Sequence, residues 1–328
     1  MVAAPSIAPS DAPRRSRGGR HRLTPQRALF FALFLGAPLL LYVLFVVWPV
    51  LQAIFYSLTN WRGLAATPEF IGLDNYVRLF NDGIFRQALV NNLILLIVLP
   101  TVVITLAFVL AVLVTVGGNS RGQIRGVGGA NLYRMVSFFP YVVPAVVVGI
   151  LFAFIYSPNG GLLNGMLGLV GLNPGIGWLG HRDLALWAIM AAVVWSLVGF
   201  YMVLFVAAIK AVPSEIVEAA RLDGCGRFRL AVGVILPMIR ENVSTAAVYM
   251  GIVALDMFVY IRVMTPNGGT GKSTEVISRY LYETAFQKSQ FGLASAMGVV
   301  LALVTMLMAV IVLFGFRQIG RASCRERV

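Results

Sequence analysis

QALVNNLILLIVLPTVVITLAFVLAVLVTVGGNS, residues 87–120, contains no charged side chain, although Arg86 and Arg121 stand immediately outside it. A helix of about 20 predominantly apolar residues is long enough to cross the hydrocarbon core of a bilayer. Because the stretch exceeds that length without a charge, it predicts a membrane-spanning helix, which we place at 88–116. A lipid bilayer is therefore the solvent that decides this fold.

The rest of the 328-residue chain repeats this pattern. Hydrophobic residues make up 59% of it and charged residues only 12%, whereas soluble domains carry about 25% charged residues. The first apolar run of the chain, from Ala28 to Leu58, is much longer than the apolar core of a secretory signal peptide. We therefore expect it to be a retained membrane anchor. We predict an all-α integral membrane protein with six transmembrane helices, at 28–57, 88–116, 133–156, 184–209, 242–264 and 291–316.

Lysine and arginine are distributed unevenly between the two sides that these spans define. One side, formed by the two tails and by the second-to-third and fourth-to-fifth connections, carries 18 of them, and the other side carries 8. Since Lys and Arg accumulate in cytoplasmic loops, this bias predicts a multi-pass protein of the cell membrane with both termini in the cytoplasm. The same bias explains the net charge of +13 without nucleic acid as a partner.

The order of these segments predicts three regions. Residues 1–27, rich in Pro, Ala, Ser and Arg, are expected to form a disordered basic cytoplasmic tail. Residues 28–316 are expected to form the transmembrane domain, which includes a charged cytoplasmic loop at 210–240. Residues 317–328 are expected to form a cytoplasmic C-terminal tail, whose abrupt end leaves open a truncated or artefactual terminus.

Residues suited to metal-dependent or nucleophilic catalysis are scarce in this sequence. The histidines and cysteines are few and have no metal-ligand spacing: His21, His181, Cys225 and Cys324. The segment GGTGKST, residues 268–274, is close to a phosphate-binding loop, but Pro266 stands where the first glycine of that pattern belongs. We therefore expect no metal, no cofactor and no nucleotide site in this chain.

The charged loop between the fourth and fifth spans has its own pattern, EAARLDGCGRFRLAVGVILP at 218–237. Pro213 ends the fourth span, and Ser214 is placed to cap a following helix that has acidic residues in its first turn. Gly224 and Gly226 allow a sharp turn into a second short helix. The sequence thus predicts a compact pair of short helices on the cytoplasmic face.

This loop resembles the signature loop of the permease subunits of ATP-binding-cassette importers. The residues that carry the resemblance are Glu218, Ala219, Ala220, Asp223, Gly224, Leu236 and Pro237, and Val234 stands where the family usually has Ile. The resemblance implies that they form a coupling-helix loop seated in a groove of a separate ATPase subunit. It also implies that Glu218 pairs with a basic residue there and that Gly224 permits the bend. The residues alone leave open an amphipathic helix that touches only lipid head groups.

Three further segments resemble the maltose-type, carbohydrate-importing branch of that family. IGLDNYVRLFND (71–82) and FRQALVNNLILL (85–96) are similar to its first loop and second span. VMTPNGGTGKSTEVISRYLYETAF (263–286) is similar to the loop before its last span. The branch often has Phe-Asp where Phe258-Val259 stands, which leaves sugar contact on this helix open.

The partners that follow are implied by the resemblance and not by the residues alone. They are cytoplasmic ATPase subunits, which bind ATP and Mg²⁺ in place of this chain, a second permease subunit of different sequence, and an extracytoplasmic sugar-binding protein. Acidic residues in the predicted extracytoplasmic loops are candidate docking positions for the binding protein.

Polar and aromatic side chains inside the spans are the candidates for a substrate pathway. Asp256 is the one carboxylate well inside a span, where an ionisable group needs a cavity or a partner. At helical spacing it shares a face with Tyr249 and Tyr260, an arrangement that suits stacking and hydrogen bonding to a sugar. A structural pair of Asp256 with Arg262 or with a neighbouring helix is an equal alternative. Trp195 and Phe200 form a second candidate patch, for which simple packing is favoured.

The combined prediction is a permease subunit of an ATP-driven importer that moves a sugar or oligosaccharide by alternating access. An importer of glycerophosphate or another polar solute is the nearest alternative. Two alternatives come from other classes. One is a channel, which would conduct without ATP, and the other is a membrane-embedded enzyme, for which the sequence offers no convergent His, Cys or paired carboxylates.

Overall fold

The computed structural model of the protein describes residues 30, 32–63, 67–116, 129–172 and 175–325. Within these ranges the regular structure is helical, apart from an isolated bridge between Thr59 and Phe70. The predicted all-α class is therefore confirmed. The basic tail predicted at 1–27 lies outside the described residues. The chain separates into two units, Met1–Gln52 and Ala53–Val328.

The described part of the first unit is a run of short helical segments. It comprises η1 (Ala32–Gly36), α2 (Ala37–Tyr42), η2 (Val43–Val47) and the beginning of α3 (Trp48–Ser57). Leu33–Ser57 as a whole is long and apolar enough to cross a membrane. None of residues 33–52 is buried within the protein, as expected of apolar side chains that face lipid.

Three π-helical turns in the chain share one cause. Each of η1, η2 and η3 (Ala231–Ile235) ends two residues before a proline: Pro38, Pro49 and Pro237. Proline has no N–H, so the carbonyl four residues before it loses its α-helical donor. That carbonyl lies inside the π-helical turn each time, where i→i+5 bonding offers a different donor. The helices therefore continue past these prolines.

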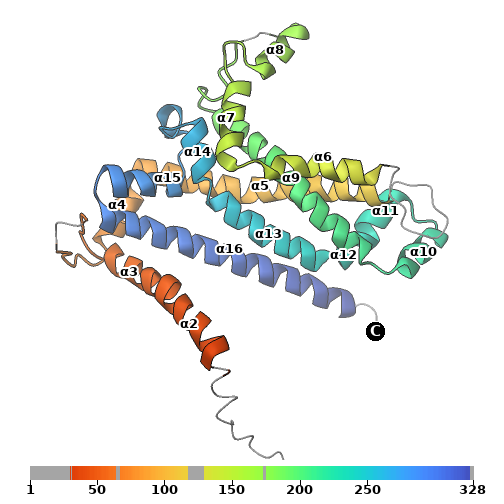
Figure 1. The fold of residues 1–328 in the computed structure, drawn as a ribbon, viewed down its shortest axis with the longest axis horizontal. Coiled ribbons are helices and arrows are strands. Elements are labelled where there is room, and N and C mark those ends of the chain that lie inside the picture. The colour runs from red at the N-terminus through yellow and green to blue at the C-terminus, as the bar shows by residue number, and fades with distance from the viewer. Residues whose placement is uncertain (1–29, 31, 64–66, 117–128, 173–174, 326–328) are drawn as a thin grey trace, which may run out of the picture. The chain divides into compact units, whose positions relative to one another are not determined.

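The core of the second unit is built on four long helices. They are α5 (Gly83–Val116), α9 (Ala185–Lys210), α13 (Arg240–Leu255) and α16 (Phe291–Arg325). α5 packs against α9 and α13, and α13 packs against α16 (Figure 1). Fully buried side chains such as Leu99 of α5, Phe205 of α9 and Met250 of α13 belong to one apolar cluster.

Two glycines set how closely these helices approach their neighbours. A Cβ atom on Gly199 of α9 would lie 1.6 Å from the carbonyl oxygen of Ser137 in α6 (Ala130–Val142). A Cβ atom on Gly251 of α13 would lie 2.6 Å from the Met308 side chain of α16. Small residues at such crossings are typical of helix packing in membranes, where close backbone approach supplies the attraction.

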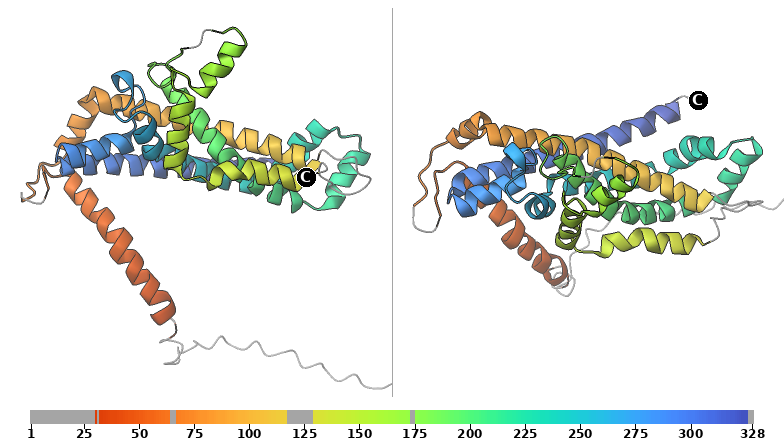
Figure 2. Two further views of the ribbon diagram at one scale, coloured as in Figure 1. Left: turned by 45° about the horizontal axis from the view of Figure 1, so that its top comes forward. Right: turned by 90° about the horizontal axis from the view of Figure 1, so that it is seen from above.

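The shorter helices gather at the two ends of this bundle. α4 (Asp74–Asn81) and α15 (Ile277–Tyr282) lie at one end of α5, and α10 (Ser214–Leu222) and α11 (Arg227–Leu230) lie at the other (Figures 1 and 2). We call the first of these the α15 end. We call the second the hairpin end, because α10 and α11 form a helical hairpin there. The two loops that the sequence predicts on opposite sides of the membrane are thus at opposite ends of the bundle. A further pair, α7 (Ala145–Ile155) and α14 (Phe258–Met264), packs together.

Among the described residues, four helices are long and apolar enough to cross a membrane, and the count reaches six if each of two bent pairs is one span. α6 and α7 form one pair, bent by 96°, where a single span at 133–156 is predicted. Residues 227–238 and 240–255 form the other, bent by 76°. The fifth span predicted at 242–264 contains the break between α13 and α14. The count of six stays a prediction.

Candidate functional site

A hairpin of two short helices, α10 and α11, follows α9. The backbone amide of Gly224 donates to the carbonyl oxygen of Arg221, and that of Cys225 donates to Ala220, both at 3.0 Å. Gly224 has a φ of +78°, in the left-handed region that glycine occupies without strain, so it closes α10 in a Schellman motif. Ser214 is the first residue of α10, which has no side-chain cap, so the capping role predicted for Ser214 is wrong.

The hairpin has a buried side and an exposed side. Val217 of α10 is 2% exposed and Leu230 of α11 is 1% exposed, and both join the apolar core. The residues of the predicted coupling motif are more accessible: Ala219, Asp223 and Gly224 are exposed, and Glu218 and Ala220 are half-buried. The fold therefore anchors the hairpin through one face and leaves the motif accessible to another molecule.

Two large apolar side chains on the hairpin are absent from the sequence-based site. Leu222 is 89% exposed and Phe228 is 82% exposed, on either side of the Gly224 turn. We call these two residues the apolar tip. The signal in the sequence is a single apolar residue between charged ones, twice within a loop, in Arg-Leu-Asp and Arg-Phe-Arg. An apolar side chain left exposed in a polar loop is available for contact with another protein or with lipid head groups.

Leu236 and Pro237 lie where the hairpin joins α13. They begin α12 (Leu236–Met238), directly after η3, and the chain then bends into α13. Leu236 is half-buried and Pro237 is exposed. Leu236 and Pro237 thus lie in the segment that connects the hairpin to α13. A displacement of the hairpin would therefore move the start of α13.

One face of α13 is exposed along the whole helix and is mostly polar. Its exposed side chains, which recur at helical intervals, are Glu241, Asn242, Thr245, Tyr249, Ile252 and Asp256, just past the end of the helix. We call this set the polar face of α13. Near the hairpin end, three of its members and Leu204 of α9 line a hollow of about 270 Å³. Polar side chains at membrane depth avoid lipid, so this face suits a water-filled path or another subunit.

The polar face ends at a break in the helix. α13 stops at Leu255, and Asp256, with φ of −102° and ψ of 57°, separates it from α14. The side chain of Asn92, which is fully buried on α5, donates to the carbonyl oxygen of Leu255 at 3.3 Å and accepts from the amide of Ile277 at 2.9 Å. A freed carbonyl inside a membrane needs such a partner. The break between α13 and α14 is therefore stabilised by the hydrogen bond from Asn92.

Asp256 is exposed. Within the described ranges, its carboxylate accepts no hydrogen bond and forms no ion pair. The alternative pair with Arg262 is contradicted, because that guanidinium donates to the carbonyl oxygen of Pro266 at 3.3 Å and lies 5.8 Å from the ring centre of Tyr282.

Tyr249 and Asp256 share the polar face, as helical spacing predicts, but Tyr260 does not. Tyr260 is 8% exposed and lies in α14, beyond the break, beside Ser196 of α9. The prediction of one shared face is wrong for this residue, because the periodicity of α13 does not continue across Asp256. A role for Tyr260 in a substrate pathway stays a prediction.

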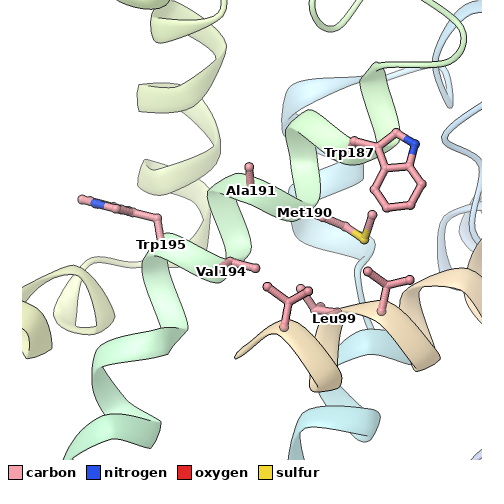
Figure 3. A pocket seen from close by; sticks show the side chains of 8 residues that line it. Leu99, Trp187, Met190, Ala191, Val194 and Trp195 are labelled. Carbon is pink, nitrogen blue, oxygen red and sulfur yellow. The ribbon is translucent and has the colours of Figure 1, made fainter. Parts of the chain in front are cut away.

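Trp195 and Phe200 of α9 lie in different surroundings. Trp195 is 39% exposed and, with Trp187 and Met190, lines an apolar hollow of about 380 Å³ between α9 and α5 (Figure 3). Phe200 stacks on Tyr141 of α6 with ring centres 4.5 Å apart. Their part in a pathway stays a prediction, and the lining of this hollow is mostly apolar.

A cluster of charged side chains, which we call the knot, stabilises the loop at the α15 end. Arg279 is 2% exposed and Glu275 fully buried, and the two form a bidentate pair. Glu283 accepts from Arg279 at 2.7 Å and lies 3.0 Å from the Lys288 ammonium group. Lys272, the lysine of the GGTGKST segment, lies 3.4 Å from both Glu275 and Glu283. Lys272, Arg279 and Lys288 are thus each paired with a glutamate of the same loop.

The knot shifts the pKa values of its members. Burial by itself would raise the pKa of Glu283, but hydrogen bonds from Lys288 and Arg279 and the charge of Lys272 lower it to about 2. Burial by itself would lower the pKa of Arg279, but its bonds to the two glutamates raise it. Tyr280, which donates to an Asp82 carboxylate oxygen at 2.5 Å, has a raised pKa because of burial and of that carboxylate.

The same loop contacts the segment that precedes α9. The Thr270 hydroxyl donates to the carbonyl oxygen of Gly180 at 2.7 Å, and residues of both segments line a hollow of about 430 Å³. Asn91 of α5 donates to the carbonyl oxygens of Ser273 and Glu275, at 2.9 and 2.8 Å. The α15 end therefore presents an ordered polar surface tied to the membrane helices.

An all-helical membrane bundle with an accessible hairpin at one end, a braced polar loop at the other and a broken polar helix between them defines a transport subunit. The chain belongs to the family of binding-protein-dependent transport system inner membrane components, whose model matches residues 124–322.

Two curated relatives place the chain further within this family. It is 50% identical over 314 residues to the diacetylchitobiose uptake system permease protein NgcF of Streptomyces coelicolor, covering 95% of this chain and 89% of the relative. It is 35% identical to the probable ABC transporter permease protein YurN of Bacillus subtilis, covering 82% of this chain and 90% of the relative.

A solved structure supports the fold. A chain of a bacterial alginate ABC transporter, in complex with an alginate-pentasaccharide-bound periplasmic protein, superimposes with a TM-score of 0.74. The superposition covers 90% of this chain and 96% of that one, at 22% sequence identity. The predicted membership in the family of importer permeases is confirmed.

Proposed function

We propose that this chain is the permease subunit of an ATP-driven importer that moves a sugar or oligosaccharide across the cell membrane by alternating access. The observation that carries this proposal is the direct link between the hairpin and α13. The hairpin carries an exposed apolar tip suited to another protein, and α13 carries a polar face suited to a polar solute. The name of the 50% identical relative, a diacetylchitobiose uptake permease, supports a sugar as that solute.

The hairpin is the proposed seat of a cytoplasmic ATPase subunit. Its apolar tip, together with Ala219 and Asp223, enters a groove of that subunit, and Glu218 pairs with a basic residue at its rim. ATP and Mg²⁺ are bound by the ATPase and not by this chain. In support, the lysine of the GGTGKST segment is held by Glu275 and Glu283 at the opposite end of the bundle. In this arrangement the hairpin end and both termini face the cytoplasm.

Two other partners complete the transporter. The α15 end, with the braced loop and the hollow beside Thr270, is the proposed docking surface for a soluble sugar-binding protein outside the cell. A second permease subunit of different sequence closes the path that the polar face of α13 lines. Closure of two ATPases moves both hairpins, and the bend at α12 passes that movement to α13, which is a two-state change biased by ligands at each end.

Copurification in mild detergent tests the hairpin, and uptake tests the solute. The chain should copurify with a cytoplasmic ATPase subunit, and cells with the complete system should accumulate labelled N,N′-diacetylchitobiose only while they can make ATP. Replacing Phe228 with Asp should remove the ATPase from the complex and abolish uptake. A charged side chain cannot replace a ring that the groove of the ATPase is expected to bury. A chain that conducts solute without ATP and binds no ATPase would be a channel, and the proposal would be wrong.

A further inference from the structure

The electrostatic character of the polar face of α13 bears on which solutes it accepts. Its charged members are two carboxylates, Glu241 at the hairpin end and Asp256 at the break. The sequence has no Lys, Arg or His between Arg240 and Arg262. Arg262 is engaged by Pro266 and Tyr282. No cation of the described part of α13 or α14 therefore compensates Asp256.

The depth of Asp256 makes this charge effective. It lies sixteen residues beyond Arg240, about 24 Å along the helix axis, which places it in the outer part of a bilayer core about 30 Å thick when Arg240 marks the cytoplasmic edge. A carboxylate inside the hydrocarbon core is retained where water, a ligand or an oppositely charged partner reaches it. In a narrow path with low-dielectric walls the field of a single charge is focused onto the solute. A carboxylate accepts hydrogen bonds and donates none, so it favours ammonium, amide N–H and hydroxyl groups.

We propose that Asp256 gives the transport path a charge preference, in which neutral and cationic amino sugars pass and uronates or phosphorylated sugars are repelled. This inference rests on the proposed function, and it names the class of sugar. It also counts against glycerophosphate, which is anionic, as the solute of this chain. In the alternative arrangement, a basic side chain of the second permease subunit pairs with Asp256. Water would then be absent from this position.

A thiol-reactivity experiment tests the preference without any sugar. In the intact transporter in lipid nanodiscs, with Cys225 and Cys324 replaced by Ser, Ile252 is replaced by Cys, one turn from Asp256 on the same face. Reaction rates are measured with a cationic and an anionic methanethiosulfonate reagent of similar size. A unit charge about 6 Å away changes each rate about threefold in opposite directions at the dielectric constant of water, so the ratio carries about a tenfold bias.

Two matched variants isolate the charge. Asp256→Asn, which keeps the shape and removes the charge, should lower the cation-to-anion rate ratio about tenfold. Asp256→Glu should keep the ratio. Ile97→Cys, on an exposed part of α5, serves as a lipid-facing control and should react with neither reagent. A ratio that stays within twofold in Asp256→Asn, or an Ile252→Cys protein that is inert to both reagents, would overturn the inference.

A sugar-binding measurement separates this inference from the proposed function. Equilibrium binding of chitobiose, which carries two ammonium groups, of diacetylchitobiose and of an unsubstituted diuronate is compared in wild type and in Asp256→Asn. Chitobiose should lose several-fold in affinity and the diuronate should gain, while diacetylchitobiose changes least. Binding and uptake of sugar with no change in the reagent ratio leaves the function standing and defeats the inference. A shifted ratio with no sugar bound leaves a cation-preferring path and defeats the sugar assignment.

Discussion

The side-chain amide of Asn92 on α5 donates to the carbonyl oxygen of Leu255, 3.3 Å away, at the residue where α13 ends. The same side chain accepts from the amide of Ile277, at the start of α15. One fully buried side-chain amide therefore bonds both to the end of α13 and to the start of α15. The polar face of α13 ends at this support.

Replacing Asn92 with Leu should destabilise the protein. It leaves the Leu255 carbonyl and the Ile277 amide buried without their partner, and each such group costs about 1–3 kcal/mol. We expect a clear drop in the thermal midpoint of the purified complex, measured by fluorescence in detergent. Asn159→Leu, at an exposed loop position, is the control and should leave the midpoint within a degree or so. Equal midpoints for the two variants would contradict the role assigned to Asn92.

Gly224 and Gly226 form a natural matched pair. Neither has an atom near its missing Cβ, but Gly224 has a φ of +78° and Gly226 a φ of −66°. Alanine at position 224 should cost about 1 kcal/mol or more of hairpin stability because of backbone strain alone, whereas alanine at 226 should cost little. Gly224→Ala should therefore reduce ATPase-coupled uptake several-fold and Gly226→Ala should not. Transport rates that fall equally in both would show that the turn geometry is not what matters.

The sequence predicts the class, the hairpin and the two ends of the bundle, because each depends on local signals. Runs without charge, turn glycines and an Ala-Ala pair at fixed spacing can be read without knowing any distant contact. Phe228 and Leu222 carry a local signal too, since each stands between charges in a loop, but they are not part of the motif that resembles the family. These parts of the site were open to prediction.

The break at Asp256 could not be predicted in the same way. Helical periodicity within α13 places Tyr249 and Asp256 on one face, but it cannot show that the helix stops there and that Tyr260 turns into the core. That depends on Asn92, which is more than 160 residues away in the chain. The pairing of Arg262 with Pro266, and not with Asp256, likewise depends on the path of the loop after α14.

The apolar tip predicts which residues carry the association with an ATPase. Leu222→Asp places a charge where an 89% exposed leucine is expected to be buried by the partner. Loss of a well-packed apolar anchor costs about 2 kcal/mol or more at an interface. The variant should lose ATPase in copurification while its own thermal midpoint stays unchanged, because the side chain makes little contact within the chain.

Leu169→Asp is the control for this experiment. Leu169, in α8, is also 89% exposed but lies far from the hairpin in the sequence. It should retain the ATPase in full. Equal retention by both variants would move the ATPase contact away from the apolar tip.

The lowered pKa of Glu283 predicts how the α15 end responds to acid. A carboxyl group whose pKa falls from 4.5 unfolded to about 2 folded contributes stability above pH 4.5, and this contribution is lost as the pH falls through 2. The side chain is 16% exposed, so the contribution is on the order of 3 kcal/mol. Wild type should therefore unfold at a higher temperature than Glu283→Gln at pH 6, and the gap should narrow steadily below pH 4.5.

Glu69→Gln provides the matched control for Glu283. Glu69 is an exposed carboxylate whose one side-chain bond within the described part of the chain is to Asn60 in a surface loop, so its removal should leave the thermal midpoint unchanged at every pH. The measurement is a series of thermal scans of the three proteins in detergent between pH 7 and pH 3.5. A gap between wild type and Glu283→Gln that stays constant across that series would mean that the carboxylate charge does not stabilise the knot, since a neutral amide would then serve as well.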